Sequence, residues 1–220
     1  GHIEYALPEQ QNVLLSDFRA DPAAHPLSTP SGRIELYSEK LAAFAYEECP
    51  GHPAWLPSEE FLGGPRAVQF PLHMLSNQPA SRLHSQYDHG VVSQASKISG
   101  REPMKMNSQD AAARGIRSND VVKVFNDRGA MLAGAVVTDS VRTGVVQIAT
   151  GAWYDPVEPG VVGSLDKHGN PNVLTPDRGS SRLGQGCAAQ SALVQVIRWD
   201  GPLPDITAYD PPRLIPDPAP

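Results

Sequence analysis

Proline and glycine interrupt this chain so often that no long helical periodicity survives between them. Of its 220 residues, 22 are proline and 19 are glycine. Each proline removes a backbone donor and restricts the residue before it. Because these two residues together exceed their average share of a protein sequence, the chain is expected to form short strands and turns rather than a helical bundle.

Short β-rich runs recur from residue 67 onward, each bounded by Gly, Asn, Asp or Pro, which is typical of a compact β domain or barrel. The predicted strands are 68–75, 120–125, 131–138, 145–149 and 192–199. A helix is predicted over 109–114, with Asn107 or Ser108 as its N-cap and Gly115 as a left-handed stop. The turn 126–129 predicts a hairpin with a positive φ at Gly129.

Residues 1–66 have a different character, because prolines break every periodic stretch in them. Arg33–Tyr37 alternates like a short strand after a turn, and Ser38 is placed to cap a helix over Glu39–Glu47. This segment has too little apolar sequence to fold alone, so we interpret 1–66 as a connecting arm. Residues 67–200 are then the main domain, and 201–220 a Pro-rich tail that is expected to lie extended on the surface.

Charge and composition exclude several classes of function. The net charge of −6 and the absence of any basic cluster disfavour nucleic-acid binding. No apolar run is long enough to cross a bilayer, and the first residues do not resemble a signal peptide. Cys49 and Cys187 lie far apart and form no zinc-type spacing, so no metal site is predicted.

Three polar segments stand out: 76–86 (SNQPASRLHSQ), which follows a predicted strand, 126–129 (NDRG) and 170–187. Amide and carboxylate groups offer paired donors and acceptors to the edge of a heterocycle, and arginine can hold a phosphate with two hydrogen bonds. The segments therefore favour a large, flat, polar ligand that carries phosphates, with solvated turns as the alternative interpretation. Nothing indicates nucleophilic catalysis, since there is no GxSxG motif and neither cysteine has an evident base.

These segments resemble the C-terminal cofactor-binding domain of the dimethyl sulfoxide reductase family of molybdenum enzymes. The run 76–86 is similar to the pterin-contacting segment of that family, and 126–129 and 169–186 match later segments in the same order. Residues 29–38 resemble the stretch that leads into this domain. Residues 49–55 lean towards the biotin sulfoxide reductase branch, with trimethylamine N-oxide and dimethyl sulfoxide reductases as close competitors.

The resemblance implies a mainly β fold, a double-psi β-barrel of six strands with a few short helices and an N-terminal extended arm. It implies that the domain binds part of bis(molybdopterin guanine dinucleotide), whose molybdenum is held by a serine of an earlier domain. The parent enzymes reduce S-oxides or N-oxides by oxygen-atom transfer. The implied partners are the rest of the same polypeptide and the oxide substrate, with no nucleic acid and no membrane insertion.

The resemblance also assigns the polar residues, and it assigns this chain no catalytic residue and no metal ligand. The residues expected to contact the cofactor are Asn77, Arg82, His84, Ser85, Gln86, Asn126, Asn172, Asp177 and Gln185. Among them, Arg82 or a run of backbone N–H groups is expected to hold phosphate charge, and Asp177 to accept hydrogen bonds from a guanine or pterin amino group.

The chain looks like about the last quarter of a longer enzyme, since it lacks an initiating Met and begins with an arm. Alone, it is expected to be catalytically silent and to retain no cofactor, because a half-formed site no longer offsets the cost of ordering a ligand. The expected location is the cytoplasm, with the periplasm as the alternative. A separate, non-catalytic pterin-binding subunit is the competing hypothesis. A self-cleaving decarboxylase barrel is a weaker one, since nothing around Gly163-Ser164 or Gly179-Ser180 suggests that chemistry.

Overall fold

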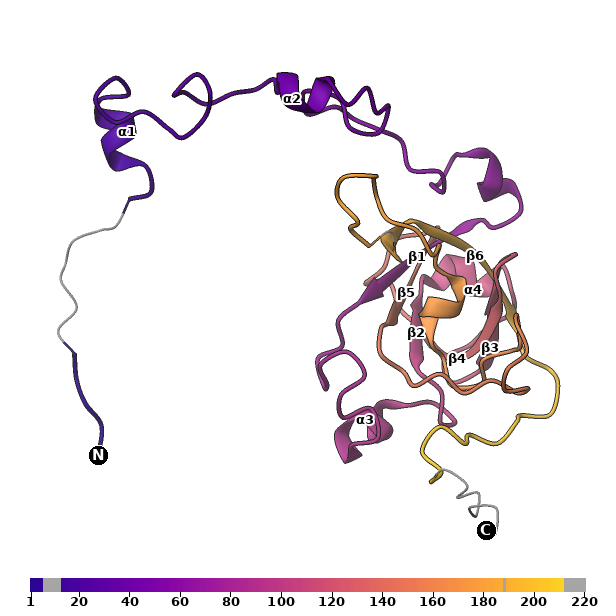
Figure 1. The fold of residues 1–220 in the computed structure, drawn as a ribbon. Helices are drawn as coiled ribbons and strands as arrows, with labels where there is room; N and C mark the ends of the chain where they lie inside the picture. The colour runs from indigo at the N-terminus through magenta and orange to yellow at the C-terminus, as the bar shows by residue number, and fades with distance from the viewer. Residues whose placement is uncertain (6–12, 188, 212–220) are drawn as a thin grey trace, which may run out of the picture. The chain divides into compact units, whose positions relative to one another are not determined.

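The structure, a computed structural model, describes residues 1–5, 13–187 and 189–211. It divides into two compact units, Gly1–Leu56 and Pro57–Pro220. All six strands belong to the second unit (Figure 1). The domain boundaries at 66 and 200 stay predictions, although residues beyond both of them bond to the barrel. The Glu60 carboxylate accepts a hydrogen bond from the backbone N–H of Leu193, and the backbone N–H of Thr207 donates one to the Asp155 carboxylate.

The described part of the first unit holds two short helices, α1 (Ser16–Ala20) and α2 (Glu39–Ala42), and no strand. The predicted cap of α2 is confirmed, because the Ser38 hydroxyl accepts the backbone N–H of Leu41 at 3.3 Å. The helix is shorter than predicted and ends before Ala45, whose φ of 51° is left-handed and incompatible with a continuing helix.

The predicted strand over Arg33–Tyr37 is wrong. The carbonyl of Arg33 accepts the Thr29 hydroxyl at 2.6 Å, and the Ser31 backbone N–H donates to Glu35. These local bonds fold the segment into turns. An alternating pattern makes a strand only where a second strand pairs with it, and the described part of this unit has none.

Six strands of the second unit close into a barrel in the order β1-β5-β2-β4-β3-β6 (Figure 1). Their bounds are β1 Leu72–Asn77, β2 Pro103–Met106, β3 Val121–Phe125, β4 Ala130–Val137, β5 Val145–Ala149 and β6 Ala192–Arg198. Two pairs, β1–β5 and β2–β4, are parallel, and the other four are antiparallel. The expected fold class is confirmed: a mainly β double-psi barrel with few, short helices.

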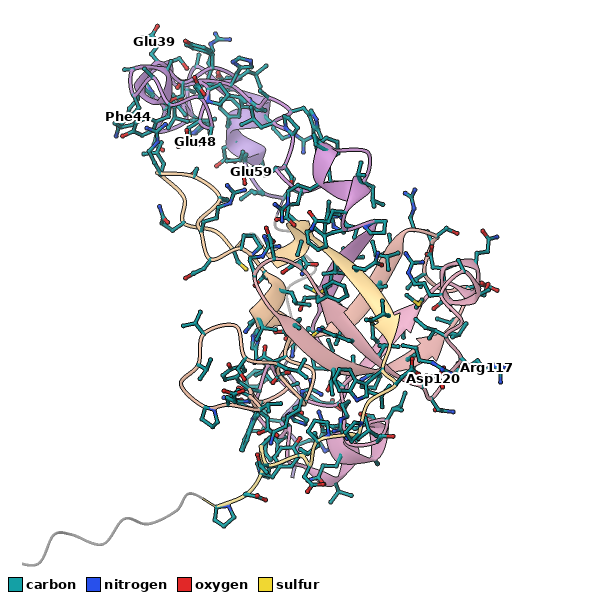
Figure 2. The ribbon with its side chains drawn as sticks, turned by 90° about the vertical axis from the view of Figure 1, so that its right-hand side faces the viewer. Glu39, Phe44, Glu48, Glu59, Arg117 and Asp120 are labelled. Carbon is teal, nitrogen blue, oxygen red and sulfur yellow. The ribbon has the colours of Figure 1, made fainter. Side chains whose placement is uncertain are left out.

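The strand pairing decides where the connections gather. The C-terminal ends of β1, β3 and β5 lie at the same end of the barrel as the N-terminal ends of β2, β4 and β6. The connections 78–102, 126–129 and 150–191 all leave from this end, which we call the loop end. It carries all three polar segments recognised in the sequence. Arg117 and Asp120, labelled in Figure 2, belong to the connection into β3 at the opposite end.

The barrel interior is apolar and tightly filled. In β1, buried residues alternate with more exposed ones, as expected for a strand with one face inward. All four methionines of the chain point into this core with no exposed surface: Met74, Met104, Met106 and Met131. Their unbranched side chains fill irregular gaps that β-branched neighbours leave.

The short helices of the second unit connect the strands. They are η1 (Pro65–Val68), α3 (Val91–Ser96), α4 (Ser108–Ala112), η2 (Pro171–Leu174) and η3 (Ala189–Ser191). Helix α4 has the predicted cap, because the Asn107 side chain accepts the N–H of Gln109, and Gly115 follows with a φ of +63°. Among the described residues, no helix is long and apolar enough to span a membrane.

Two predictions at turns and strand ends need correction. Gly129 does not have a positive φ. A side chain at this position would instead place its Cβ 2.8 Å from the Val173 carbonyl oxygen, so glycine is needed for a close backbone approach. The first strand begins at Leu72 rather than residue 68, because Pro65 starts the 3₁₀ turn η1.

Gly134 offers a test of the barrel packing. It lies in β4, where an added Cβ would be 2.3 Å from the Cβ of Ile98. We expect Gly134→Ala to lower the free energy of unfolding by about 1–3 kcal/mol, because the packed neighbour has to move. Urea denaturation measures this, with Gly184→Ala as the control, since its Cβ would have its nearest contact at 3.6 Å. Equal urea midpoints for Gly134→Ala and Gly184→Ala would contradict the close packing of Gly134 against Ile98.

Candidate functional site

The connection that leaves β1 is organised by a buried arginine. The Arg82 guanidinium donates to the His84 carbonyl (3.2 Å), to the Thr150 carbonyl (2.9 Å) and to the Ser93 hydroxyl (3.2 Å). Its side chain is only 1% exposed. Each of its three guanidinium nitrogens thus has a protein partner, and the role of Arg82 in holding a phosphate stays a prediction.

Arg82 belongs to a buried ion cluster, which we define as Arg82, Asp88, Lys97 and Glu102. Arg82 lies 3.0 Å from Glu102, and the Lys97 ammonium lies 2.8 Å from both carboxylates. Burial alone would raise the pKa of Asp88, but the hydrogen bond from Lys97 and the backbone N–H of Trp153 hold it below its ordinary value. With two cations and two anions, the cluster is neutral as a whole.

His168 and Tyr209 extend this cluster towards the C-terminal segment. The His168 ring, which has no exposed surface, bonds through Nδ1 to the Trp153 carbonyl (2.8 Å) and through Nε2 to the Tyr209 hydroxyl (3.0 Å). Burial, reinforced by the charge of Lys97, lowers the pKa of His168, which favours the uncharged ring. Tyr209 also bonds to Asp88 at 3.1 Å. The tail that the sequence predicts to lie on the surface is therefore anchored at residue 209.

Three exposed residues of the same connection, His84, Ser85 and Gln86, form what we call the 84–86 loop. His84 has a left-handed backbone with a φ of 49°. Asn77 lies at the end of β1, where its amide donates to the Gln78 carbonyl at 2.9 Å. Five of the predicted residues thus lie at the end of β1 or in the connection that follows it: Asn77, Arg82, His84, Ser85 and Gln86. The last three are open to solvent.

Asn126, in the β3–β4 turn, is buried rather than available at the surface. Its amide donates to the carbonyls of Leu174 (2.8 Å) and Leu193 (3.1 Å), and its oxygen accepts the N–H of Arg128. Both amide protons are in use, so Asn126 ties three chain segments together. Its contact with a cofactor stays a prediction.

Next to this turn lies a carboxylate that the sequence analysis missed. Glu60 bonds to both terminal nitrogens of Arg128 (2.5 and 3.0 Å) and accepts the backbone N–H of Leu193 (2.7 Å). It is 6% exposed. Burial alone would raise the pKa of Glu60, but the bonds to Arg128 and Leu193 lower it below 4.5. No local pattern marks this residue, because its partners are remote in sequence.

A groove of 790 Å³ opens in the connection 150–191. Its lining residues are Asn172, Thr175, Pro176, Asp177, Arg178, Gly179, Gln185, Gly186 and Cys187. Glu59, labelled in Figure 2, forms an ion pair with Arg178 of this lining. Three predicted cofactor residues therefore meet here.

Asp177 offers an exposed carboxylate that is available to a ligand in this groove. It is exposed, and its carboxylate forms no hydrogen bond or ion pair with any residue that the structure describes. The Gln185 amide, by contrast, donates to the Ser181 carbonyl at 2.9 Å and lies over Gly179. A free carboxylate beside two amide side chains offers acceptors and donors that match the edge of a purine or pterin.

Comparison with known proteins identifies the barrel. Residues 72–193 match the family described as the molydopterin dinucleotide binding domain. The chain belongs to this family. The matched residues begin with β1 and end in β6, so they include the whole loop end of the barrel.

Several reductases are similar to the chain over nearly its whole length. It is 45% identical over 214 residues to a dimethyl sulfoxide/trimethylamine N-oxide reductase of Cereibacter sphaeroides, which covers 97% of this chain and 26% of that protein. It is 47% identical over 208 residues to trimethylamine-N-oxide reductase 1 of Escherichia coli K12, covering 94% and 24%. The chain thus spans about a quarter of the length of these curated relatives.

A solved structure supports the fold alone. Acetylene hydratase from Pelobacter acetylenicus superposes with a TM-score of 0.65 and 17% sequence identity. The superposition covers 81% of this chain and 25% of the hydratase chain.

The residues of the loop end fit a molybdopterin dinucleotide. Such a ligand is long, with a pterin and a nucleotide base joined by phosphates, and each ring system presents N–H and carbonyl groups. The groove offers a carboxylate that has no partner among the residues the structure describes, and the 84–86 loop offers exposed imidazole, hydroxyl and amide groups. The described residues contain no group of three or more His, Cys, Asp or Glu side chains that would hold a metal ion.

Proposed function

We propose that this chain is the cofactor-binding domain of a molybdenum oxidoreductase that reduces S-oxides or N-oxides. In this proposal, it holds part of bis(molybdopterin guanine dinucleotide). The observation that carries the proposal is the Asp177 carboxylate, which is unpaired among the described residues and lines a groove with Asn172 and Gln185 in a molybdopterin dinucleotide-binding barrel. The names of the relatives, dimethyl sulfoxide and trimethylamine N-oxide reductases, support the substrate class.

Each part of the loop end has its own task in this proposal. Asp177 accepts two N–H groups from the base, and the amides of Asn172 and Gln185 complete the pattern of donors and acceptors. The 84–86 loop contacts the pterin portion. Bound molybdenum supplies the oxygen-atom transfer, and the residues of this chain bind and orient the group that carries it.

The proposed partner of the domain is the rest of the longer polypeptide. The first unit buries almost none of its large apolar side chains among the described residues. Those left exposed include Ile3, Tyr5, Leu14, Ile34, Leu36 and Trp55. Apolar surface of this extent is typical of a segment that other protein covers, and the relatives supply about three quarters of their length outside the matched region.

Asp177 gives the direct test of the proposal. We expect Asp177→Ala in the full-length protein to weaken retention of the guanine nucleotide by about 10- to 100-fold, the value of a hydrogen-bonding pair to a charged group. Guanine and molybdenum per polypeptide are measured after purification. The control is Asp139→Ala, an exposed carboxylate in the β4–β5 connection at the opposite end of the barrel.

Two outcomes would count against the proposal. One is an Asp177→Ala protein that carries as much guanine as the control. The other is turnover by the 220-residue chain alone, given reduced viologen and either trimethylamine N-oxide or dimethyl sulfoxide. The isolated domain is expected to be silent, because the residues described here include no metal-ligand cluster.

A further inference from the structure

The 84–86 loop is held in an unfavourable backbone conformation. His84 and the following Tyr87 both have positive φ angles, 49° and 64°, which side chains with a Cβ rarely adopt. Each such residue costs free energy, and it persists only where the surroundings enforce it. The side chains of this segment are mostly exposed to solvent. The contacts that maintain its backbone conformation therefore have to come from the part of the protein on which the segment packs.

Those contacts come from Arg82 and from Thr150–Trp153, the four residues that follow β5. Arg82 bridges the two segments, since its guanidinium donates both to the His84 carbonyl and to the Thr150 carbonyl. The Trp153 indole N–H donates to the Ser85 carbonyl at 2.8 Å. Two successive carbonyls of the 84–86 loop are therefore fixed by donors that do not belong to the loop.

Gly151 allows the two segments to approach this closely. Its φ is +94°, and a Cβ built on it would lie 1.9 Å from the His84 carbonyl oxygen and 2.2 Å from the carbonyl carbon. Gly163 provides a contrast within the same connection: its φ is +78°, but an added Cβ would meet no atom within 4 Å. Both glycines have a positive φ, but only at Gly151 would an added Cβ clash with a neighbouring segment.

Trp153 is itself held by contacts with buried and aromatic side chains. Its backbone N–H donates to the buried Asp88 at 3.0 Å, and Asp88 belongs to the ion cluster. The Tyr209 ring packs edge-on against the indole, with ring centroids 5.5 Å apart. The segment that fixes the loop is thus itself fixed by buried charges and by the C-terminal segment.

We infer that Thr150–Trp153 is a clamp that holds the 84–86 loop in its ligand-binding shape before any ligand arrives. Gly151 and Trp153 are its positioning residues. The inference rests on the proposed function, which places the pterin at this loop. A loop that is already ordered does not lose conformational freedom on binding, so the clamp strengthens cofactor retention without touching the cofactor.

The test compares Gly151→Ala and Trp153→Phe with Gly163→Ala in the full-length protein. Trp153→Phe keeps an aromatic ring and removes the indole donor, so it remains informative where Gly151→Ala fails to fold. Amide hydrogen exchange of residues 83–87 is measured in cofactor-free protein, and guanine release in loaded protein. We expect exchange to rise by about tenfold in Gly151→Ala and about fivefold in Trp153→Phe, the latter from one lost hydrogen bond. Release accelerates in parallel, and Gly163→Ala matches the wild type.

Unchanged exchange at 83–87 in both clamp variants overturns the inference, whatever happens to the cofactor. Faster exchange with unchanged guanine release also overturns it, since the clamp then does nothing for the ligand. Failure of the proposed function has a separate signature. In that case Asp177→Ala retains guanine normally, whereas failure of the clamp alone leaves the Asp177→Ala defect in place.

Discussion

Replacing Asp88 by alanine is expected to lower the free energy of unfolding of the barrel by about 3–5 kcal/mol. Asp88 has no exposed surface, and it lies 2.8 Å from Lys97 and 3.5 Å from Arg82. Without it, two buried cations face the single carboxylate of Glu102. The backbone N–H of Trp153 and the hydroxyl of Tyr209 lose an acceptor as well. Urea denaturation of the 220-residue chain measures the loss.

The matched control is Asp200→Ala. Asp200 also pairs with an arginine, Arg198, at 2.7 Å, but both side chains are more than half exposed. An exposed pair contributes at most about 1 kcal/mol, because water screens both charges. Similar midpoints for Asp88→Ala and Asp200→Ala would show that the ion cluster does not stabilise the barrel.

Glu60→Ala is expected to cost about 3 kcal/mol, because it leaves Arg128 without its carboxylate and a buried N–H of Leu193 without an acceptor. Its neighbour Glu59 is the control, since Glu59 also pairs with an arginine but is 70% exposed. Because both variants lose a carboxylate that pairs with an arginine, the difference between their free energies of unfolding reports the effect of burial. Equal stability of Glu59→Ala and Glu60→Ala would contradict the role given to Glu60.

Glu60 also gives a pH dependence of known sign. Its pKa in the folded chain lies below its ordinary value of 4.5, so it contributes stability above that value and loses it as the pH falls through the folded pKa. The stability gap between the wild type and Glu60→Gln is therefore expected to narrow as the pH falls below about 4.5. If the difference in stability between the wild type and Glu60→Gln stays constant or grows on acidification, the pKa of Glu60 is not lowered by folding.

The sequence was sufficient for most of the barrel, because its strands are short apolar runs with clear boundaries. Strand β2 (Pro103–Met106) was missed, since four residues that begin with proline and include a lysine give little alternation. It forms because β4 and β5 flank it on both sides. Arg33–Tyr37 shows the reverse case, a strand-like pattern without a partner.

The sequence likewise predicted some features of the candidate site and not others. Asn172, Asp177 and Gln185 lie in one polar segment, so local composition was enough to find them together. Arg82 and Asn126 lie in equally polar segments, yet their side chains bond to buried carbonyls of remote residues. Tyr209 reaches Asp88 across 121 positions of sequence. Such partnerships depend on how the barrel closes, and no spacing in the sequence encodes them.

The fully buried methionines have a consequence for chemical damage. A thioether is readily oxidised at a protein surface, and the resulting sulfoxide is polar and disrupts an apolar core. Here every thioether is enclosed by the barrel wall. Oxidants reach them only when strands separate. Sulfoxide formation at these positions would therefore record how often the barrel opens, and each oxidised methionine would oppose its closing again.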